Sequence, residues 1–257
     1  MTPDNQSSDP TGVAVKTVEL TDPGGTIRGQ VQVDTGPMRL AELVPTAIEL
    51  TMVLSTRANQ REEKQGKAIS CAAGCGACCR QLVPVSPPEA FWLADVIRSL
   101  PNERRDVVMS RFNHIADDVE QRGMVEDMYN PPPTDEPILE ISKKYFLLGM
   151  PCPFLEDESC SIHPYRPVAC REYNVTSPAD WCAEPYNHDI EKVPMPMPLS
   201  LPLTRLTSSL VGSHVPLVPL SLVPQWVEEN AELGQRTWPG LELFNKFIEF
   251  LGTARQR

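Results

Sequence analysis

Two features that assign many proteins to a functional class are scarce in this sequence: positive charge and long apolar runs. The chain has 23 Lys and Arg against 34 Asp and Glu, a formal net charge of −11, which disfavours binding to nucleic acid. Its most apolar helical stretch, residues 40–54, contains Glu42, Pro45 and Glu49 and is about 15 residues long, whereas a membrane span needs about 20. We therefore expect neither nucleic-acid binding nor a membrane span.

The first residues, MTPDNQSSDP, have no basic segment followed by an apolar one, which is the pattern of a secretory signal peptide. We therefore expect a cytoplasmic protein, in a compartment where disulfides are rare. No convincing set of nucleophile, base and orienting residue for hydrolysis or acyl transfer is recognisable either. Whether the protein is an enzyme stays open at this point.

Cysteine is what the chain does have, in two groups about seventy residues apart. Thiolates are soft anionic ligands for Zn²⁺ and for iron–sulfur clusters, and ligands two or three residues apart can converge on one ion through a turn. Gly74 and Gly76 flank one cysteine and would let that turn adopt unusual φ values. The eight predicted metal ligands are Cys71, Cys75, Cys78, Cys79, Cys152, Cys160, Cys170 and Cys182. Redox or catalytic thiols and structural disulfides are the alternatives.

Eight thiolates exceed the four that one Zn²⁺ ion or one [4Fe–4S] cluster requires. Either two centres exist, or one centre is surrounded by reduced cysteines. Cys78 and Cys79 are adjacent, and neighbouring side chains of an extended backbone point in opposite directions, so the pair could serve two centres. Cys182 is the cysteine for which a role as a small buried hydrophobic residue competes most with ligation.

Three arginines beside the cysteines, Arg80, Arg166 and Arg171, are candidates for supporting such a centre. A site with four thiolates needs compensating positive charge, and guanidinium N–H groups can donate hydrogen bonds to sulfur. Surface ion pairs are the alternative role for them. His163 is a further candidate, either as a ligand or as a donor to one.

The cysteine motifs resemble one known family. The run Cys71-x3-Cys75-Gly-Ala-Cys78-Cys79-Arg80, the Cys152-Pro-Phe-Leu tetrapeptide and the stretch from Cys160 to Arg171 are similar to the CxxCxxCC, or YkgJ-like, family of zinc- or iron-chelating proteins. The resemblance covers roughly residues 68–185. The first spacing is three residues where the family name says two, and His163 stands where a Tyr is common.

The resemblance implies a cysteine-rich metal or iron–sulfur domain of the bacterial cytoplasm. Flagellin lysine-N-methylases contain a similar domain, so an iron–sulfur enzyme of electron or group transfer is one alternative. An interaction protein stapled by a structural metal is another. The spacing of the first three cysteines also matches radical S-adenosylmethionine enzymes, but Ala77 stands where those enzymes usually have an aromatic residue.

Hydrophobic patterning predicts a mainly α fold with irregular Cys-rich loops and a small N-terminal β-hairpin. The hairpin is expected over 13–34, around the turn Asp22-Pro23-Gly24-Gly25. Helices are expected over 39–67, with a bend at Pro45, over 86–100 after a capping box, and over 102–122. A loop at 128–137, a short helix at 138–148 and an amphipathic helix after Trp238-Pro239 complete the prediction.

Residues 193–224 hold seven prolines and one charge, Arg205, while apolar residues alternate with Pro, Ser or Thr from 193 to 203. This pattern predicts an extended Pro-rich arm, packed along the core with its prolines facing water, or docked in the groove of a protein partner. We divide the chain into a disordered tail (1–11), a hairpin plus helix (12–67), a Cys-rich core (68–190) and the arm with the last helix (191–257).

Overall fold

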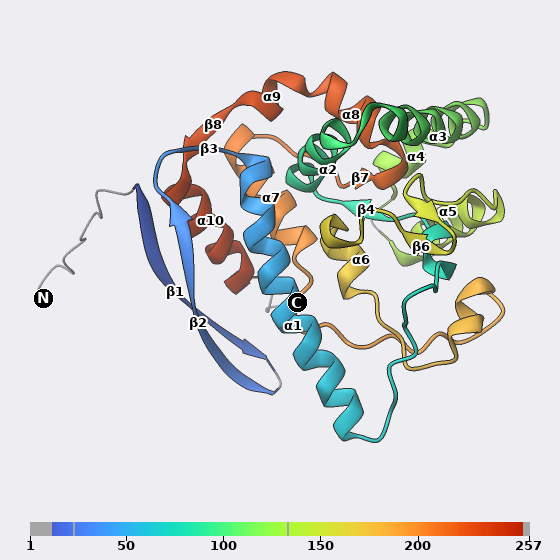
Figure 1. Ribbon diagram of the computed structural model, residues 1–257, viewed down its shortest axis with the longest axis horizontal. Helices are drawn as coiled ribbons and strands as arrows, with labels where there is room; N and C mark the ends of the chain where they lie inside the picture. Colours follow the sequence, from blue (N-terminus) through green and yellow to red (C-terminus); the bar gives the residue numbers. More distant parts are fainter. Residues whose placement is uncertain (1–11, 23, 133, 254–257) are drawn as a thin grey trace, which may run out of the picture.

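Helices form most of the molecule, with a long β-hairpin along one side (Figure 1). The computed structural model describes residues 12–22, 24–132 and 134–253. Within these ranges it has ten α-helices and an N-terminal antiparallel hairpin, so the predicted mainly α fold is confirmed. The predicted tail, 1–11, lies outside the described ranges.

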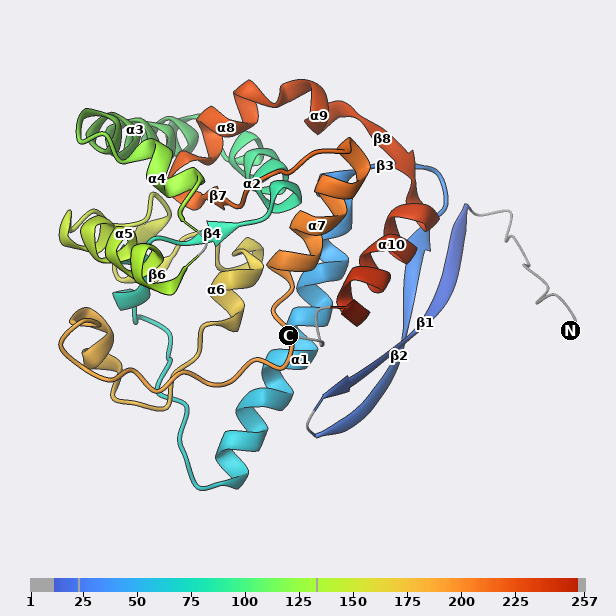
Figure 2. The same cartoon turned by 180° about the vertical axis from the view of Figure 1, so that it is seen from behind.

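The hairpin pairs β1 (Val13–Asp22) with β2 (Gly25–Asp34), from Val13 opposite Asp34 to Asp22 opposite Gly25. The predicted strands are confirmed, while Pro23 of the predicted turn lies outside the described residues. Alternation turns Val18, Leu20 and Val33 into the core, and β2 lies against the last helix, α10 (Gly240–Thr253) (Figures 1 and 2).

The predicted helix over 39–67 is present with a different start. A 3₁₀ turn, η1 (Leu40–Leu43), leads into α1 (Val44–Lys64). Pro45 lies in the first turn of α1 and therefore begins the helix instead of bending it, because a first-turn residue needs no intrahelical N–H bond. Leu43, Ala47 and Leu54 of this region are buried.

Two further predicted helices are α2 (Pro87–Ser99) and α3 (Asn102–Gln121). The capping box is present, since the Ser86 N–H donates to Glu89 Oε2 at 2.9 Å and the Glu89 N–H donates to Ser86 Oγ at 3.4 Å. The predicted loop at 128–137 is shorter than expected, because α4 (Val125–Tyr129) and α5 (Asp135–Leu147) extend into it.

Glu89 is fully buried and joins three helix N-termini. Besides the Ser86 backbone, it accepts hydrogen bonds from Ser86 Oγ at 2.6 Å, from the Val168 N–H at 2.7 Å and from Ser200 Oγ at 3.3 Å. Val168 begins α6 (Val168–Glu172) and Ser200 begins α7 (Ser200–Val211). Burial raises the pKa of the Glu89 carboxyl, while the donors around it favour the charged form.

The predicted continuous extended arm is wrong from Ser200 onward, where α7 begins. Pro202 lies in the first turn of α7, where proline is tolerated. The buried positions therefore change from a period of two to a helical period: Leu203 is 0% exposed, whereas Leu201, predicted to be buried, is 47% exposed. Residues 193–199 follow the prediction more closely, with Val193, Met197 and Leu199 buried and Pro194 and Pro198 exposed.

After α7 the chain returns over the helices through β7 (Val218–Pro219), η5 (Leu220–Leu222), α8 (Val223–Glu229), α9 (Ala231–Gln235) and β8 (Thr237–Pro239). β7 pairs with β4 (Pro84–Val85), and β8 pairs with β3 (Pro37–Arg39). The predicted C-terminal helix is confirmed as α10, with Phe244, Phe247 and Leu251 buried.

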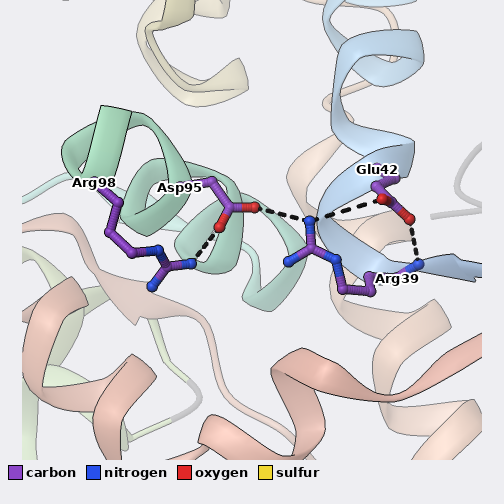
Figure 3. Close-up of polar contacts among 4 residues, drawn as sticks. All are labelled: Arg39, Glu42, Asp95 and Arg98. Carbon is purple, nitrogen blue, oxygen red and sulfur yellow. Dashed lines mark hydrogen bonds and ion pairs between the residues drawn. The ribbon is translucent and has the colours of Figure 1, made fainter. Parts of the chain in front are cut away.

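A polar cluster at the start of η1 ties it to α2 (Figure 3). Arg39 Nη2 lies 3.2 Å from Asp95 Oδ2, and Arg98 pairs with the other oxygen of the same carboxylate. The Glu42 carboxylate accepts from the Arg39 N–H at 2.6 Å. Arg39 and Arg98 also line an apolar pocket of about 290 Å³ between α2, α8 and α9.

One hydrophobic core unites the hairpin, α1, α2, α7 and α10, and half-buried Cys152 and Cys160 pack against it. A smaller cluster joins α3, α4 and α5 through Ile115, Met128 and Ile141. The cysteine loops are thus anchored at the edge of the main core. In the described part of the chain no helix is both long and apolar enough to cross a membrane.

Candidate metal centre

The first cysteine group follows α1 in an irregular segment that ends in the 3₁₀ turn η2 (Ala77–Arg80). Two successive backbone turns carry it: the Cys75 N–H donates to Ala72 O at 3.2 Å and the Cys79 N–H to Gly76 O at 3.0 Å. Gly74 has φ +83°, a conformation that favours glycine. The unusual φ predicted for Gly74 is therefore present.

The second group is held by short elements. After Cys152 the Leu155 N–H donates back to Cys152 O at 2.9 Å, and β5 (Leu155–Glu156) pairs with β6 (Ser159–Cys160). Asp157 and Glu158 form the two-residue turn between them with φ of 48° and 55°, as a hairpin of this length requires. Asp157 and Glu158 are both exposed, so this turn is solvated.

The two groups lie side by side in space (Figures 1 and 2). The Cys152 N–H donates to Cys79 O at 2.7 Å, a direct backbone bond between the groups. Arg80 forms two hydrogen bonds to the Glu158 carboxylate, at 2.7 and 3.0 Å.

Gly76 lies so close to the second group that a Cβ on it would stand 2.6 Å from Glu158 Oε2 and 2.7 Å from Leu155 Cδ1. Its own φ is −98°. The sequence assigned Gly76 to an unusual φ, and this is wrong: the position needs glycine for close approach of two segments.

Cys170 lies in α6 and Cys182 in the 3₁₀ turn η4 (Ala179–Ala183). η4 packs against η2, which brings Cys182 to the first group, although 103 residues separate it from Cys79. Cys75, Ala179 and Ala183 line a surface pocket of about 570 Å³ together with Arg80 and Glu158.

All eight cysteines are free thiols. Cys71 and Cys75 are exposed, Cys182 is 4% exposed, and the others are half-buried. Burial raises the pKa of the Cys152 thiol to about 12 and that of Cys170 well above its ordinary value, and neighbouring cysteines add to both effects. The hydrogen bond between Cys78 and Cys79 lowers the pKa of Cys78 to about 7 and raises that of Cys79.

Backbone N–H groups already point at several of these sulfurs. Those of Phe154 and Ile162 donate to Cys152 and Cys160, each two residues earlier, and oppose the pKa rise that burial causes. The Val175 N–H donates to Cys71 in the same way. Such donors stabilise thiolates and are typical of thiolate metal sites.

The three arginines have different environments. Arg80 is used by Glu158 and by Gly76 O, so it has the ion-pair role. Arg171 is buried and donates to Arg166 O at 2.9 Å and to Pro164 O at 2.7 Å, which fixes the backbone before α6. The Nε atom of Arg166 is buried and has no hydrogen-bond partner in the described ranges. His163 is exposed, and the Arg166 charge lowers its pKa.

Among the residues that the structure describes, no three His, Cys, Asp or Glu side chains are gathered closely enough to hold a metal ion. Loading would therefore require thiol side chains to turn toward a shared ion. The chemistry of the donor set nevertheless fits a thiolate-bound metal: the residues that would hold it are cysteines, with N–H donors beside them and an unpartnered guanidinium nitrogen.

Residues 70–190 match the model of the CxxCxxCC family, described as "Putative zinc- or iron-chelating domain". This segment is similar to that family, and we call residues 70–190 the CxxCxxCC domain after the model that they match. The CxxCxxCC domain contains all eight cysteines and the three arginines, so the resemblance seen in the sequence is confirmed. No curated protein and no solved structure matches the chain.

Sequence reasoning missed two residues of this region. Sequence analysis gave Glu158 no role in the site, yet its carboxylate accepts hydrogen bonds from Arg80 and lies close to Gly76. Val175 supplies an N–H to Cys71 from a segment without any recognisable motif. Only the abundance of acidic residues in the turn could have suggested Glu158 as a partner for an arginine.

Proposed function

We propose that the CxxCxxCC domain of this protein binds zinc or iron through its eight cysteines, in two adjoining centres. The observation that carries this proposal is the meeting of the two cysteine groups, through the bond from the Cys152 N–H to Cys79 O. A backbone bond at 2.7 Å leaves the side chains of both segments within reach of a shared ion.

The division into two centres follows from what surrounds Cys78 and Cys79. η2 packs against η4, and the pocket at Cys75 is also lined by residues of η4, which supports one centre between these two turns. The backbone bond from Cys152 to Cys79 and the β5–β6 hairpin support a second centre beside Cys79. We assign Cys71, Cys75, Cys78 and Cys182 to one centre. We assign Cys79, Cys152, Cys160 and Cys170 to the other.

Mutual electrostatic effects support the same division. Burial raises the pKa of Cys182 most, followed by the charges of Cys71, Cys78 and Cys75. For Cys170, burial is again first, followed by Cys152, Cys78 and Cys160. The effect of Cys78 on both sets supports two centres that lie next to each other.

Four-thiolate sites accept both Zn²⁺ and a [4Fe–4S] cluster. The deciding experiment is anaerobic purification followed by metal analysis and absorption spectroscopy. Two zinc centres would give a colourless protein with about 2 Zn per chain, and two cubane clusters a brown protein with about 8 Fe. A protein that takes up neither metal under reducing, anaerobic loading contradicts the proposal.

Single substitutions test the assignment of ligands. We expect Cys182→Ser and Cys160→Ser each to remove about half of the bound metal, because each belongs to a different centre. Cys78→Ser, at the junction, should lose the most and should also destabilise the fold. Ser161→Ala, beside Cys160, is the control and should keep full occupancy. Full occupancy in all three cysteine variants would refute the ligand set.

A second candidate function is an iron–sulfur enzyme of electron or group transfer. The pocket of about 570 Å³ at Cys75 favours it, because the pocket would place a small substrate beside the first centre. Reversible reduction and reoxidation of an iron-loaded protein, followed by its absorption spectrum, tests this function. An iron-loaded protein that cannot be reduced, or a protein that takes only zinc, rules it out.

We also propose a cytoplasmic location, because thiols stay reduced there and all eight cysteines are free. A protein partner that binds residues 193–224 would have to use the exposed side chains of this segment, such as Leu201, since other apolar residues such as Leu203 and Leu206 are buried. Fractionation of cells, and binding assays with a Leu201→Asp variant, test these two statements.

A further inference from the structure

Arg166 is a cation without an anionic partner. Its Nε atom is buried and has no hydrogen-bond partner in the part of the chain that the structure describes, and no carboxylate pairs with its guanidinium there. The protein has 34 acidic residues against 23 basic ones, so counter-charges are not in short supply. A buried donor of this kind costs free energy unless something satisfies it.

Arg166 also stands beside other positive charges. The Arg171 side chain donates to Arg166 O at 2.9 Å, and burial followed by the Arg166 charge lowers the pKa of Arg171. The Arg166 charge is the largest cause of the lowered pKa of His163. This group of like charges is therefore self-repelling in the metal-free protein.

The Arg166 charge also acts on cysteine thiols of both groups. Burial raises the pKa of Cys71, Cys160 and Cys170, and the Arg166 charge opposes the rise in each. Arg166 also contributes, after the hydrogen bond from Cys79, to the lowered pKa of Cys78. Arg166 is thus near both sets of cysteines, whereas Arg80 is already used by Glu158.

We propose that Arg166 is the counter-ion of the metal–thiolate centres and donates its free Nε–H to a ligand sulfur. This inference rests on the proposed function. Four thiolates around Zn²⁺ leave a net charge of about −2, so loading replaces repulsion between arginines by attraction to the ligands. Arg166 is accordingly a positioning residue whose charge favours the loaded state over the empty one.

The test uses the full chain with three substitutions: Arg166→Gln, Arg166→Lys and, as a matched control, Arg122→Gln. Two quantities are measured anaerobically: the Zn²⁺ dissociation constant, by competition with a chromophoric chelator, and the melting temperature of the metal-free protein. We expect Arg166→Gln to weaken Zn²⁺ binding about 10–100-fold without lowering the metal-free melting temperature, because a self-repelling charge is removed.

Arg166→Lys should recover part of the affinity, since it keeps the charge and loses the Nε–H. Arg122→Gln should change the affinity less than about threefold, because Arg122 pairs with Asp118 on the surface of α3, away from the cysteines. A wild-type affinity in Arg166→Gln overturns the inference, and so does a fall in the metal-free melting temperature equal to that of the loaded protein. If wild-type protein binds neither zinc nor iron, the proposed function itself has failed.

Discussion

Glu89 and Arg166 are both ionisable side chains with buried polar atoms, and they differ in the hydrogen bonds that these atoms make. Glu89 is fully buried and receives hydrogen bonds from Ser86, Val168 and Ser200, at the starts of three helices. Arg166 has a buried nitrogen with no partner in the described ranges. The Glu89 carboxyl therefore has its hydrogen-bond partners within the folded chain, whereas Arg166 Nε has none among the described residues.

On the proposal made above, the difference separates a charge that stabilises the fold from a charge that would meet a bound metal centre. A buried charge whose hydrogen bonds are all made fixes the elements around it, and here it joins α2, α6 and α7. A buried donor left without a partner is retained at a cost, which is expected where an external group supplies the acceptor. Substitutions among the packed helices should therefore change mainly the stability of the protein, whereas substitutions among the cysteine loops should change mainly its metal affinity.

The largest effect on stability is expected for Glu89→Ala. The substitution leaves the N–H groups of Ser86 and Val168 buried without an acceptor, and we expect the free energy of unfolding to fall by about 3–5 kcal/mol. Urea denaturation of the metal-free protein measures it. A loss below about 1 kcal/mol would show that water or rearrangement replaces the carboxylate, and the contrast with Arg166 would disappear.

Leu203→Ala tests the apolar core of the packed helices. Leu203 is 0% exposed, so the substitution creates a cavity and should cost about 2–5 kcal/mol. Leu201→Ala is the matched control: two residues away and 47% exposed, it should change stability by no more than about 0.5 kcal/mol. Equal losses in the two variants would favour the extended arm over α7.

Glu89→Gln sharpens the comparison through pH. Burial raises the pKa of Glu89 in the folded protein above its ordinary value of about 4.5, so this carboxyl takes up a proton more readily in the folded chain than in the unfolded one. Its contribution to stability is complete below pH ~4.5 and is lost as the pH rises through the folded-state pKa. Unfolding of metal-free wild type should become easier with rising pH, and less so for Glu89→Gln; parallel curves would contradict the assignment.

Gly76→Ala should have the smallest effect on stability and a large one on metal binding. The added Cβ would meet Glu158 and Leu155 and push the second cysteine segment away from the first. We expect Zn²⁺ affinity to fall at least about tenfold while the metal-free protein loses about 1 kcal/mol or less. Gly252→Ala, with no atom within 4 Å of the new Cβ, is the control, and an equal affinity in both variants would argue against close approach.

The helix starts show which parts of the fold could be predicted from neighbouring residues in the sequence. The capping box at Ser86 was recognisable because all its members lie within four residues. Pro45, Pro137 and Pro202 were taken as a bend, as part of a loop and as part of an extended arm, yet each lies in the first turn of a helix. A proline at that position is compatible with the helix, and the downstream residues decide whether a helix follows.

The sequence by itself determined the features that depend on residues near one another in the chain: the hairpin around its Pro-Gly turn, the amphipathic helices and the cysteine motifs that identify the CxxCxxCC domain. The tertiary structure alone decided which arginine is left free, why Gly76 must be glycine, and that residues 200–211 are helical. In each case the deciding partner is far away in the chain, as Glu158 is from Arg80 and Glu89 from Ser200. Spacing in a motif cannot specify a hydrogen bond or a close contact that exists only after the chain has packed.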